Sequence, residues 1–353
     1  MLDARKAFRS DDPLRALGIR VSVPVVDDGQ RAWIAGRLLA GDAKAAILAD
    51  LVRAGVPVVA ARAEMEAAAE HPYVKAAAVL QARVAKRDWL LECRAKLERQ
   101  GLREVPRRHA LDSALFFANH YATLTPVVLT GLADDWPAMA WSLEVLAKKV
   151  GNPEVEVQMD RETDANFEMN SIAHKRRMRW LDVLALLCAD PETNDFYLTA
   201  NNSGVNRKAL GCLWRDIGAL PGYLGPGYLG PNRLGDGFFW MGPKGTVTPW
   251  HHDLTQNLLM TMEGVKRVTL VSPLETPRMQ NHRHCFSRFG ADAQLGGADI
   301  PRLVVDIGPG DILFIPVGWW HHVEGLSRTI GMSFTNFVWP NEFPATYSMD
   351  GPL

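Results

Sequence analysis

The stretch TVTPWHHDLTQNLLMTMEGVKRVTLVSP, residues 246–273, decides the fold prediction for this chain. It is rich in Thr, Val and Leu, residues that fit the pleated, half-buried surface of a strand. Side chains two residues apart on a strand share one face, so His251 and Asp253 point one way and His252 points the other. Asn257 has the same parity and, on an unbroken strand, looks into the same cavity.

A second stretch, GPGDILFIPVGWWHHVEGLSRTIGMSFTNFVWP at residues 308–340, completes the pattern. It supplies His321 after a predicted strand from Asp311 to Pro316 and a tight Gly-Trp-Trp connection. Two histidines and one carboxylate can occupy one face of an octahedral metal ion and leave three positions open, an arrangement that suits non-haem Fe(II). We therefore expect His251, Asp253 and His321 to bind a metal ion.

Lys266 occupies an unexpected position in this region, because it lies on the apolar face of its predicted strand. In the predicted strand VKRVTLV it shares a face with Val268 and Leu270, which places an ammonium on the apolar side. A buried ammonium is costly unless it is paired, and no Asp or Glu lies nearby at matching parity. The carboxylate of a ligand would resolve this conflict.

These motifs carry a family resemblance. The pattern T-P-x-H-x-D, an Asn four residues later, then G-x-K-R, then PGDILFIPVGWWHHVE and a further Asn resembles the JmjC/cupin-8 group of Fe(II)- and 2-oxoglutarate-dependent oxygenases. Within that group it is similar to the asparaginyl hydroxylase of the hypoxia-inducible factor and to bacterial cupin-like proteins. The resemblance spans about residues 105 to 340. Val338 departs from it, because the asparaginyl hydroxylase has a tryptophan there, above the pocket.

The resemblance implies a fold, a set of cofactors and a set of residue roles. The fold is mainly β with α additions: a double-stranded β-helix, or jelly-roll cupin barrel, whose interior forms a ligand cavity. The cofactors are Fe(II), 2-oxoglutarate as co-substrate and O2. The metal ligands are His251, Asp253 and His321, in preference to His322. The residues implied at the co-substrate are Lys266, Thr248, Asn257, Asn336 and Tyr197, although Tyr197 is equally well explained as strand packing.

Three functions remain open. The first is hydroxylation of a C–H bond on a protein or peptide side chain, and the second is the same reaction on a small metabolite or natural product. The third is a cupin-like binding protein without catalysis, although such a protein has no need of an inward lysine. Turnover of 2-oxoglutarate distinguishes the third function from the other two. Demethylation is chemically adjacent, but the sequence reveals no pocket for a methylammonium group.

Composition sets further bounds. The chain of 353 residues is 47% hydrophobic and 22% charged, with a formal net charge of −1. This balance gives no global attraction to nucleic acid or anionic membranes, and no apolar run reaches the length of a membrane span. The N-terminus lacks the apolar core of a secretory signal, and the four cysteines are too far apart to suggest a zinc site or a disulfide framework. We expect a cytoplasmic protein with neither a nucleic-acid nor a membrane partner.

Residues 1–105 are predicted to form an N-terminal helical region, and residues 106–353 the β-domain. Apolar residues recur at helical spacing from Pro72 to about Arg99, with a basic opposite face. We expect this helix to pack on the barrel or on a second subunit, which makes a homodimer a further hypothesis, rather than to bind substrate.

Three other segments have open interpretations. The tandem repeat GYLGPGYLGP (222–231) is either an inert connection or a lid that presents Tyr223 and Tyr228. The polar insertion 275–303 is long enough to be functional, and its His282 and His284 are expected at the surface or at substrate rather than at iron. The basic run at residues 174–179 is expected to be a helix-flanking surface rather than a phosphate site.

Overall fold

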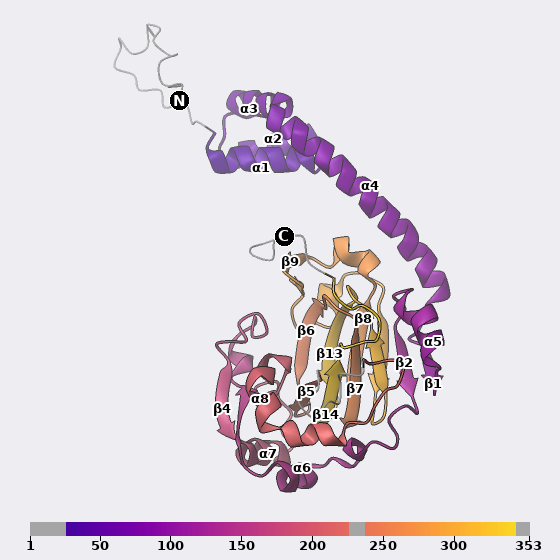
Figure 1. The fold of residues 1–353 in the computed structure, drawn as a ribbon. Helices are drawn as coiled ribbons and strands as arrows, with labels where there is room; N and C mark the ends of the chain where they lie inside the picture. Colours follow the sequence, from indigo (N-terminus) through magenta and orange to yellow (C-terminus); the bar gives the residue numbers. More distant parts are fainter. Residues whose placement is uncertain (1–25, 226–236, 344–353) are drawn as a thin grey trace, which may run out of the picture. The chain divides into compact units, whose positions relative to one another are not determined.

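The computed structural model describes residues 26–225 and 237–343, and the chain divides into two compact units between Leu90 and Leu91. Within the described ranges, no helix combines the length and the apolar content that crossing a membrane requires. Figure 1 shows the elements of both units.

The N-terminal unit is helical. It contains α1 (Asp28–Leu39), α2 (Lys44–Arg53), α3 (Val58–Glu70) and the start of α4 (Pro72–Gly101). A capping box starts α1: the Asp27 carboxylate accepts from Gln30 N at 2.7 Å, and Asp27 N donates to Gln30 Oε1 at 3.1 Å. A small core holds the first three helices together, formed by Val26, Ile34, Ile47, Leu51, Val56, Ala61 and Met65.

The second unit is built on two six-stranded sheets. The first sheet has the order β1-β2-β12-β7-β14-β5, with bounds Arg107–His109, Val127–Thr130, Ile312–Ile315, Asn257–Glu263, Thr329–Phe334 and Phe238–Gly242. The second has the order β11-β8-β13-β6-β10-β9, with bounds Leu303–Ile307, Lys266–Val271, Trp320–Gly325, Val247–His252, Phe286–Ser287 and Asn281–Arg283. Most neighbouring strands are antiparallel; β1 and β2 are parallel. The prediction of a mainly β, cupin-type domain is confirmed.

Strand alternation divides the first sheet into two faces. In β7, Leu258 and Met260 pack into the main hydrophobic core, whereas Asn257 and Leu259 line a cavity on the other face. Because the side-chain period of a strand is two, a single strand can serve the core and the cavity at once. The Glu263–Gly264 turn then leads into β8. Gly264 has a φ of +80°, and a Cβ there would meet the Arg328 carbonyl, so the turn requires glycine.

Helices and a small sheet cover the core side of the first sheet. They are α5 (Ser113–Phe116), α6 (Leu143–Val150), α7 (Trp180–Cys188) and α8 (Ser203–Ala209), with β3 (Glu154–Gln158) paired to β4 (Lys175–Arg179). Figure 1 shows α6, α7 and α8 gathered with β4 beside the sheets. Side chains from α6, α7 and the first sheet share one hydrophobic core.

The basic run at 174–179 forms mainly β4, followed directly by α7. Its cations are paired on the surface: Lys175 with Glu156, Arg176 with Asp160, and Arg177 with Glu154. These pairs agree with the surface interpretation of the run.

Of the two interpretations of the repeat, the lid does not apply to Tyr223. Tyr223 is buried in the main core beside Phe116, and its hydroxyl donates to the Leu111 carbonyl. The rest of the repeat, including Tyr228, lies outside the described residues. The insertion 275–303 is also more regular than expected, since it contains short helical turns at Pro273–Arg278 and Leu295–Gly297 together with β9 and β10.

Candidate active site

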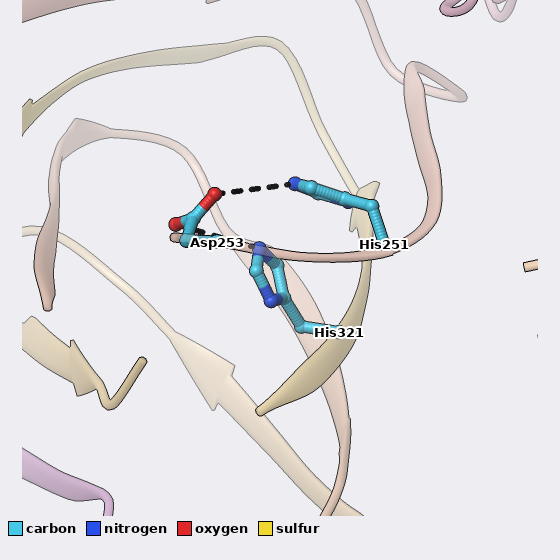
Figure 2. Close-up of side chains that lie close together, drawn as sticks. All are labelled: His251, Asp253 and His321. Carbon is cyan, nitrogen blue, oxygen red and sulfur yellow. Dashed lines mark ion pairs between the residues drawn. The ribbon is translucent and has the colours of Figure 1, made fainter. Parts of the chain in front are cut away.

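Three side chains converge where β6 meets β13 inside the second sheet. His251 on β6 is paired in register with His321 on β13, and Asp253 follows the last residue of β6. Each residue offers one ligand atom, and these atoms all lie within 4.8 Å of one another. Figure 2 shows the two imidazoles and the carboxylate facing a common point. This is the only such cluster of His, Cys, Asp and Glu found among the described residues.

Backbone carbonyls fix the orientation of both imidazoles. His251 Nδ1 lies 2.8 Å from the Pro249 carbonyl, and His321 Nδ1 lies 2.9 Å from the Trp319 carbonyl. A carbonyl only accepts, so Nδ1 carries the proton and Nε2 keeps its lone pair for a metal ion. The two Nε2 atoms face Asp253, at 3.8 and 3.9 Å from its carboxylate oxygens.

The electrostatics favour the ligand forms of these residues. Burial lowers the pKa of His251 to about 4, and the neighbouring His321 adds to this effect. Burial also lowers the pKa of His321. For Asp253, burial acts to raise the pKa, but the two imidazoles and a hydrogen bond from Asn257 outweigh it and leave the pKa below its ordinary value. At neutral pH the site therefore offers two neutral imidazoles and one carboxylate, the donor set that suits Fe(II).

A β-bulge brings Thr248 to the same side as His251. Across β6 and β13, His251 pairs with His321, but Thr248 pairs with Val323, so two residues of β6 between these pairs oppose one of β13. The extra residue reverses the alternation. Both side chains therefore line the cavity although their numbers differ in parity.

The triad opens into a cavity of about 640 Å³ between the two sheets. The first sheet contributes Trp240, Leu259 and Ser333, and the second contributes Lys266, Val323 and Phe286. Most of the walls are apolar, with a few polar groups, as is usual in small-molecule sites.

Lys266 lies on this cavity wall and is only 1% exposed. Its ammonium donates to the Tyr197 hydroxyl at 3.2 Å and lies 5.7 Å from the Trp240 ring centre. No Asp or Glu within the described part of the chain forms an ion pair with it. A buried cation with one neutral partner is a site for an anion.

The predicted co-substrate residues are mostly together in this cavity. Thr248, Asn257, Lys266 and Tyr197 all line it. Asn336 does not: it lines a neighbouring hollow with Val338 and Trp339, so the structure differs from the expectation for this residue.

The prediction for Asn257 assumed one unbroken strand from His251 to Asn257. The structure differs, because β6 ends at His252 and a new strand, β7, begins at Asn257. The turn between the strands still returns Asn257 to the triad. Its Nδ2 donates to Asp253 Oδ2 at 3.0 Å, while its Oδ1 is buried without a partner.

The other four histidines of the two motifs and the insertion do not belong to the triad cluster. His252 packs edge-on against Trp320, and His322 lies near Trp250 with its Nε2 3.0 Å from the Ala291 carbonyl. His282 lines a groove next to the cavity. His284 lies in the short connection between β9 and β10.

Sequence analysis missed Arg161, a buried cation beside the cavity. Its guanidinium donates to Asn194 Oδ1 at 2.9 Å and to the Val247 carbonyl at 2.8 Å, and it lies 3.5 Å from the Glu168 carboxylate. It also lies over the Tyr197 ring at 5.2 Å. Arg161 therefore joins the loop that bears Glu168 to β6, the strand that bears His251. No periodic pattern marks it, because it lies in a 3-10 turn (Arg161–Thr163).

Comparison with known proteins agrees with this geometry. The family model described as "Cupin-like domain" matches residues 113–343, which is more than half of the chain. The chain belongs to the cupin-like domain family. Its relatives include proteins with JmjC names, and JmjC-type cupin domains belong to the Fe(II)/2-oxoglutarate oxygenase superfamily.

Three relatives illustrate the range of names in this family. The chain is 28% identical over 244 residues to lysine-specific demethylase 8 of Xenopus tropicalis, covering 65% of this chain and 52% of the relative. It is 35% identical over 252 residues to Jumonji C domain-containing protein 5 of Drosophila melanogaster, covering 65% and 59%. It is 22% identical over 259 residues to tRNA wybutosine-synthesizing protein 5 of Gallus gallus, covering 66% and 76%. The chain thus spans about half to three-fifths of the length of the first two.

Proposed function

We propose that this protein is an Fe(II)- and 2-oxoglutarate-dependent oxygenase that hydroxylates a C–H bond on a protein or peptide side chain. The observation that carries the proposal is the pairing of two features in one cavity: a His-Asp-His cluster and a buried, carboxylate-free lysine. A metal site alone fits many proteins. A metal site together with an inward ammonium fits a bound, metal-chelating dicarboxylate.

The residues fit both groups. His251, Asp253 and His321 would hold the metal ion through two Nε2 atoms and one carboxylate, with Asn257 orienting the carboxylate. The Lys266 ammonium would hold the distal carboxylate of 2-oxoglutarate. Tyr197 and Thr248 would supply hydroxyl groups beside it, since both line the same cavity.

When bound, iron(II) and 2-oxoglutarate would activate O2, so that one oxygen atom enters the substrate C–H bond and the other enters succinate as carbon dioxide is released. The protein's own part is orientation and the exclusion of water. The apolar walls formed by Trp240, Leu259, Phe286 and Val323 keep water from the reacting centre. Lys266 would hold one end of the co-substrate, and a metal ion held by the triad would bind the other.

The test is turnover of 2-oxoglutarate by the purified protein with Fe(II) and ascorbate, measured as succinate, first alone and then with candidate peptides. Asp253→Ala should abolish the oxygen-dependent turnover and leave the fold intact, because the carboxylate is not part of the apolar core. The matched control is Asp306→Ala, which removes a surface carboxylate that pairs with Arg267. Equal turnover by the wild-type protein and Asp253→Ala would refute the proposal, and so would a failure of the manganese-loaded wild-type protein to bind 2-oxoglutarate.

Demethylation of a methylated lysine is a second candidate, favoured by the names of the relatives. It uses the same site, but the hydroxylated methyl group leaves as formaldehyde. Formaldehyde released in step with succinate from a methylated peptide would identify it. A one-oxygen gain in the mass of the peptide would identify hydroxylation instead.

A further inference from the structure

Arg161 is a buried cation that the proposed chemistry does not yet use. Its side chain is 1% exposed and lies behind the cavity wall, of which Tyr197 is part. The guanidinium lies over two aromatic rings, 4.3 Å from the centre of Phe167 and 5.2 Å from the centre of Tyr197. Burying a charge is costly, and the Glu168 carboxylate 3.5 Å away offsets this cost. The directions of the other guanidinium donors indicate what the buried charge does.

Two of these donors bind the beginning of β6. The strand β10, which neighbours β6 on the side away from β13, pairs with it only opposite His251 among the described residues. At Val247, the first residue of β6, side chains bind the backbone. The Val247 carbonyl accepts from Arg161 Nη2 at 2.8 Å, and the Val247 N–H donates to Asn194 Oδ1 at 2.8 Å. The same Asn194 oxygen accepts from Arg161 Nη1 at 2.9 Å, so Arg161 and Asn194 together clamp this end of the strand.

This clamp lies next to the bulge that turns Thr248 towards the cavity. Thr248 follows Val247 and pairs with Val323, and the bulge lies between this pair and the pair formed by His251 and His321. A bulge locally disrupts the ladder of a sheet. The direction of Thr248 therefore depends on contacts from outside the sheet, and the clamp supplies them at the adjoining residue.

Tyr197 is the cavity residue that Arg161 contacts directly. The Tyr197 ring lies under the guanidinium, and its hydroxyl accepts from Lys266 Nζ at 3.2 Å. A planar guanidinium stacks on an aromatic face while its edge donates hydrogen bonds, which a compact ammonium cannot do. Arg161 therefore restrains the tilt of the Tyr197 ring and, with it, the place of the hydroxyl beside Lys266.

From these contacts we infer that Arg161 is a positioning residue for the co-substrate. By holding the Tyr197 ring and the backbone of Val247, it keeps the hydroxyls of Tyr197 and Thr248 beside the Lys266 ammonium, where the distal carboxylate binds. The inference rests on the proposed oxygenase function and adds to it a residue that acts through others. The contacts of Arg161 in the described part of the chain do not include a triad residue, so its effect should fall on 2-oxoglutarate affinity and not on metal affinity.

The test variant is Arg161→Lys. Lysine keeps a positive charge beside Glu168, but its ammonium cannot reach the Val247 carbonyl and Asn194 while it lies flat over Tyr197. Calorimetric titration of the manganese-loaded protein should show 2-oxoglutarate bound roughly tenfold more weakly, the effect of losing one hydrogen bond to a carboxylate. Mn(II) affinity should stay near that of the wild-type protein.

Two controls separate this effect from a general loss of structure. Arg177→Lys makes the same change in an exposed pair with Glu154 and should bind 2-oxoglutarate as the wild-type protein does. Asp216→Ala removes a buried carboxylate that accepts from Trp141 and Lys149, away from the cavity lining. It should lower the free energy of unfolding but leave the 2-oxoglutarate affinity of the folded protein unchanged.

A background without the two hydroxyls shows whether Arg161 acts through them. In Tyr197→Phe, Thr248→Val protein, Lys266 and the metal ion still bind the co-substrate. Adding Arg161→Lys to this background should weaken 2-oxoglutarate binding by less than about twofold, because changes that act through the same groups are not additive. A merely structural arginine would cause the same loss in the background as in the wild-type protein.

The outcomes decide the inference in either direction. Wild-type 2-oxoglutarate affinity in folded Arg161→Lys would overturn it, and so would an equal loss in the background or a parallel loss of Mn(II) affinity. If Arg161→Lys does not fold, Asn194→Ala removes the oxygen that binds both Arg161 and Val247, and unchanged 2-oxoglutarate affinity in that variant would overturn the inference. All of these results leave 2-oxoglutarate binding by the wild-type protein, and with it the oxygenase proposal, intact. Failure of the manganese-loaded wild-type protein to bind 2-oxoglutarate would reject both.

Discussion

Lys266→Met isolates the charge that we assign to the distal carboxylate of 2-oxoglutarate. Methionine keeps the length and the apolar stem of lysine but removes the ammonium, which is 1% exposed and donates only to the Tyr197 hydroxyl at 3.2 Å. A hydrogen bond to a charged group is worth about 1.5–3 kcal/mol. Losing it should weaken 2-oxoglutarate binding roughly 10- to 100-fold. Metal affinity should stay near that of the wild-type protein, since Lys266 is not a ligand.

The same change should not destabilise the protein without ligands. A buried charge without an opposite partner costs free energy, so replacing it with an apolar group of similar volume is neutral or stabilising. The free energy of unfolding of Lys266→Met, measured by urea denaturation without metal or co-substrate, should be equal to or greater than that of the wild-type protein. Tyr197 then loses one hydrogen-bond donor but keeps its ring packing against Trp240.

The assay is calorimetric titration of the manganese-loaded protein with 2-oxoglutarate, which avoids turnover. Arg267→Met is the matched control, because Arg267 follows Lys266 on β8 but is exposed and pairs with Asp306 on the neighbouring strand. The control should bind 2-oxoglutarate as tightly as the wild-type protein. If Lys266→Met also bound it with wild-type affinity, the lysine would not hold the co-substrate, and the assignment of the pocket would have to be abandoned.

Three further changes test the surroundings of the site. Asn257→Ala removes the hydrogen bond that orients Asp253 and should lower metal affinity roughly 10- to 100-fold. Titration with Mn(II) measures the affinity, and an unchanged value would contradict the orienting role of Asn257. Arg161→Met leaves the Glu168 carboxylate without its cation and the Val247 carbonyl without its side-chain donor. It should destabilise the fold by about 3–5 kcal/mol in urea unfolding. Arg177→Met, which breaks an exposed pair, should have little effect, and similar losses in both variants would refute this. Burial raises the pKa of Tyr223 from 10.0 to about 12. The neutral hydroxyl therefore contributes stability that is fully present below pH 10 and is lost as the pH rises towards 12. Tyr223→Phe should flatten this fall in the free energy of unfolding, and an unchanged slope against pH would show that Tyr223 does not contribute.

The sequence alone predicted the parts of the site that local periodicity controls. Lys266 faces the cavity because β8 is a regular strand in which Lys266 and Val268 are buried and Arg267 is exposed. The placement of His251 and His321 could also be predicted, since each lies within or beside a segment of strong strand character. Strand side chains alternate for steric reasons that act over two residues, so no tertiary information is needed to assign their faces.

Periodicity failed where the backbone departs from a regular strand. Thr248 reaches the cavity only through the bulge in β6, and Asn257 only through the break between β6 and β7. The Gly- and Pro-rich sequence around Tyr223 left open whether it was presented by a lid, but Tyr223 is buried and its ring packs beside Phe116. For Thr248 an extra residue in the strand, and for Tyr223 contacts with distant residues, set a side-chain direction that local alternation does not give.

Tertiary structure alone decided which distant segments complete the site. Tyr197 meets Lys266 across 69 positions of sequence, and Arg161 meets Val247 across 86. Phe286 reaches the cavity because β10 pairs with β6 opposite His251. Asn336 lies only fifteen positions after His321, yet it faces a neighbouring hollow. The physical reason is that the sequence pattern sets the direction of a side chain relative to its own strand, whereas the packing of the two sheets and their loops sets which strands and loops meet.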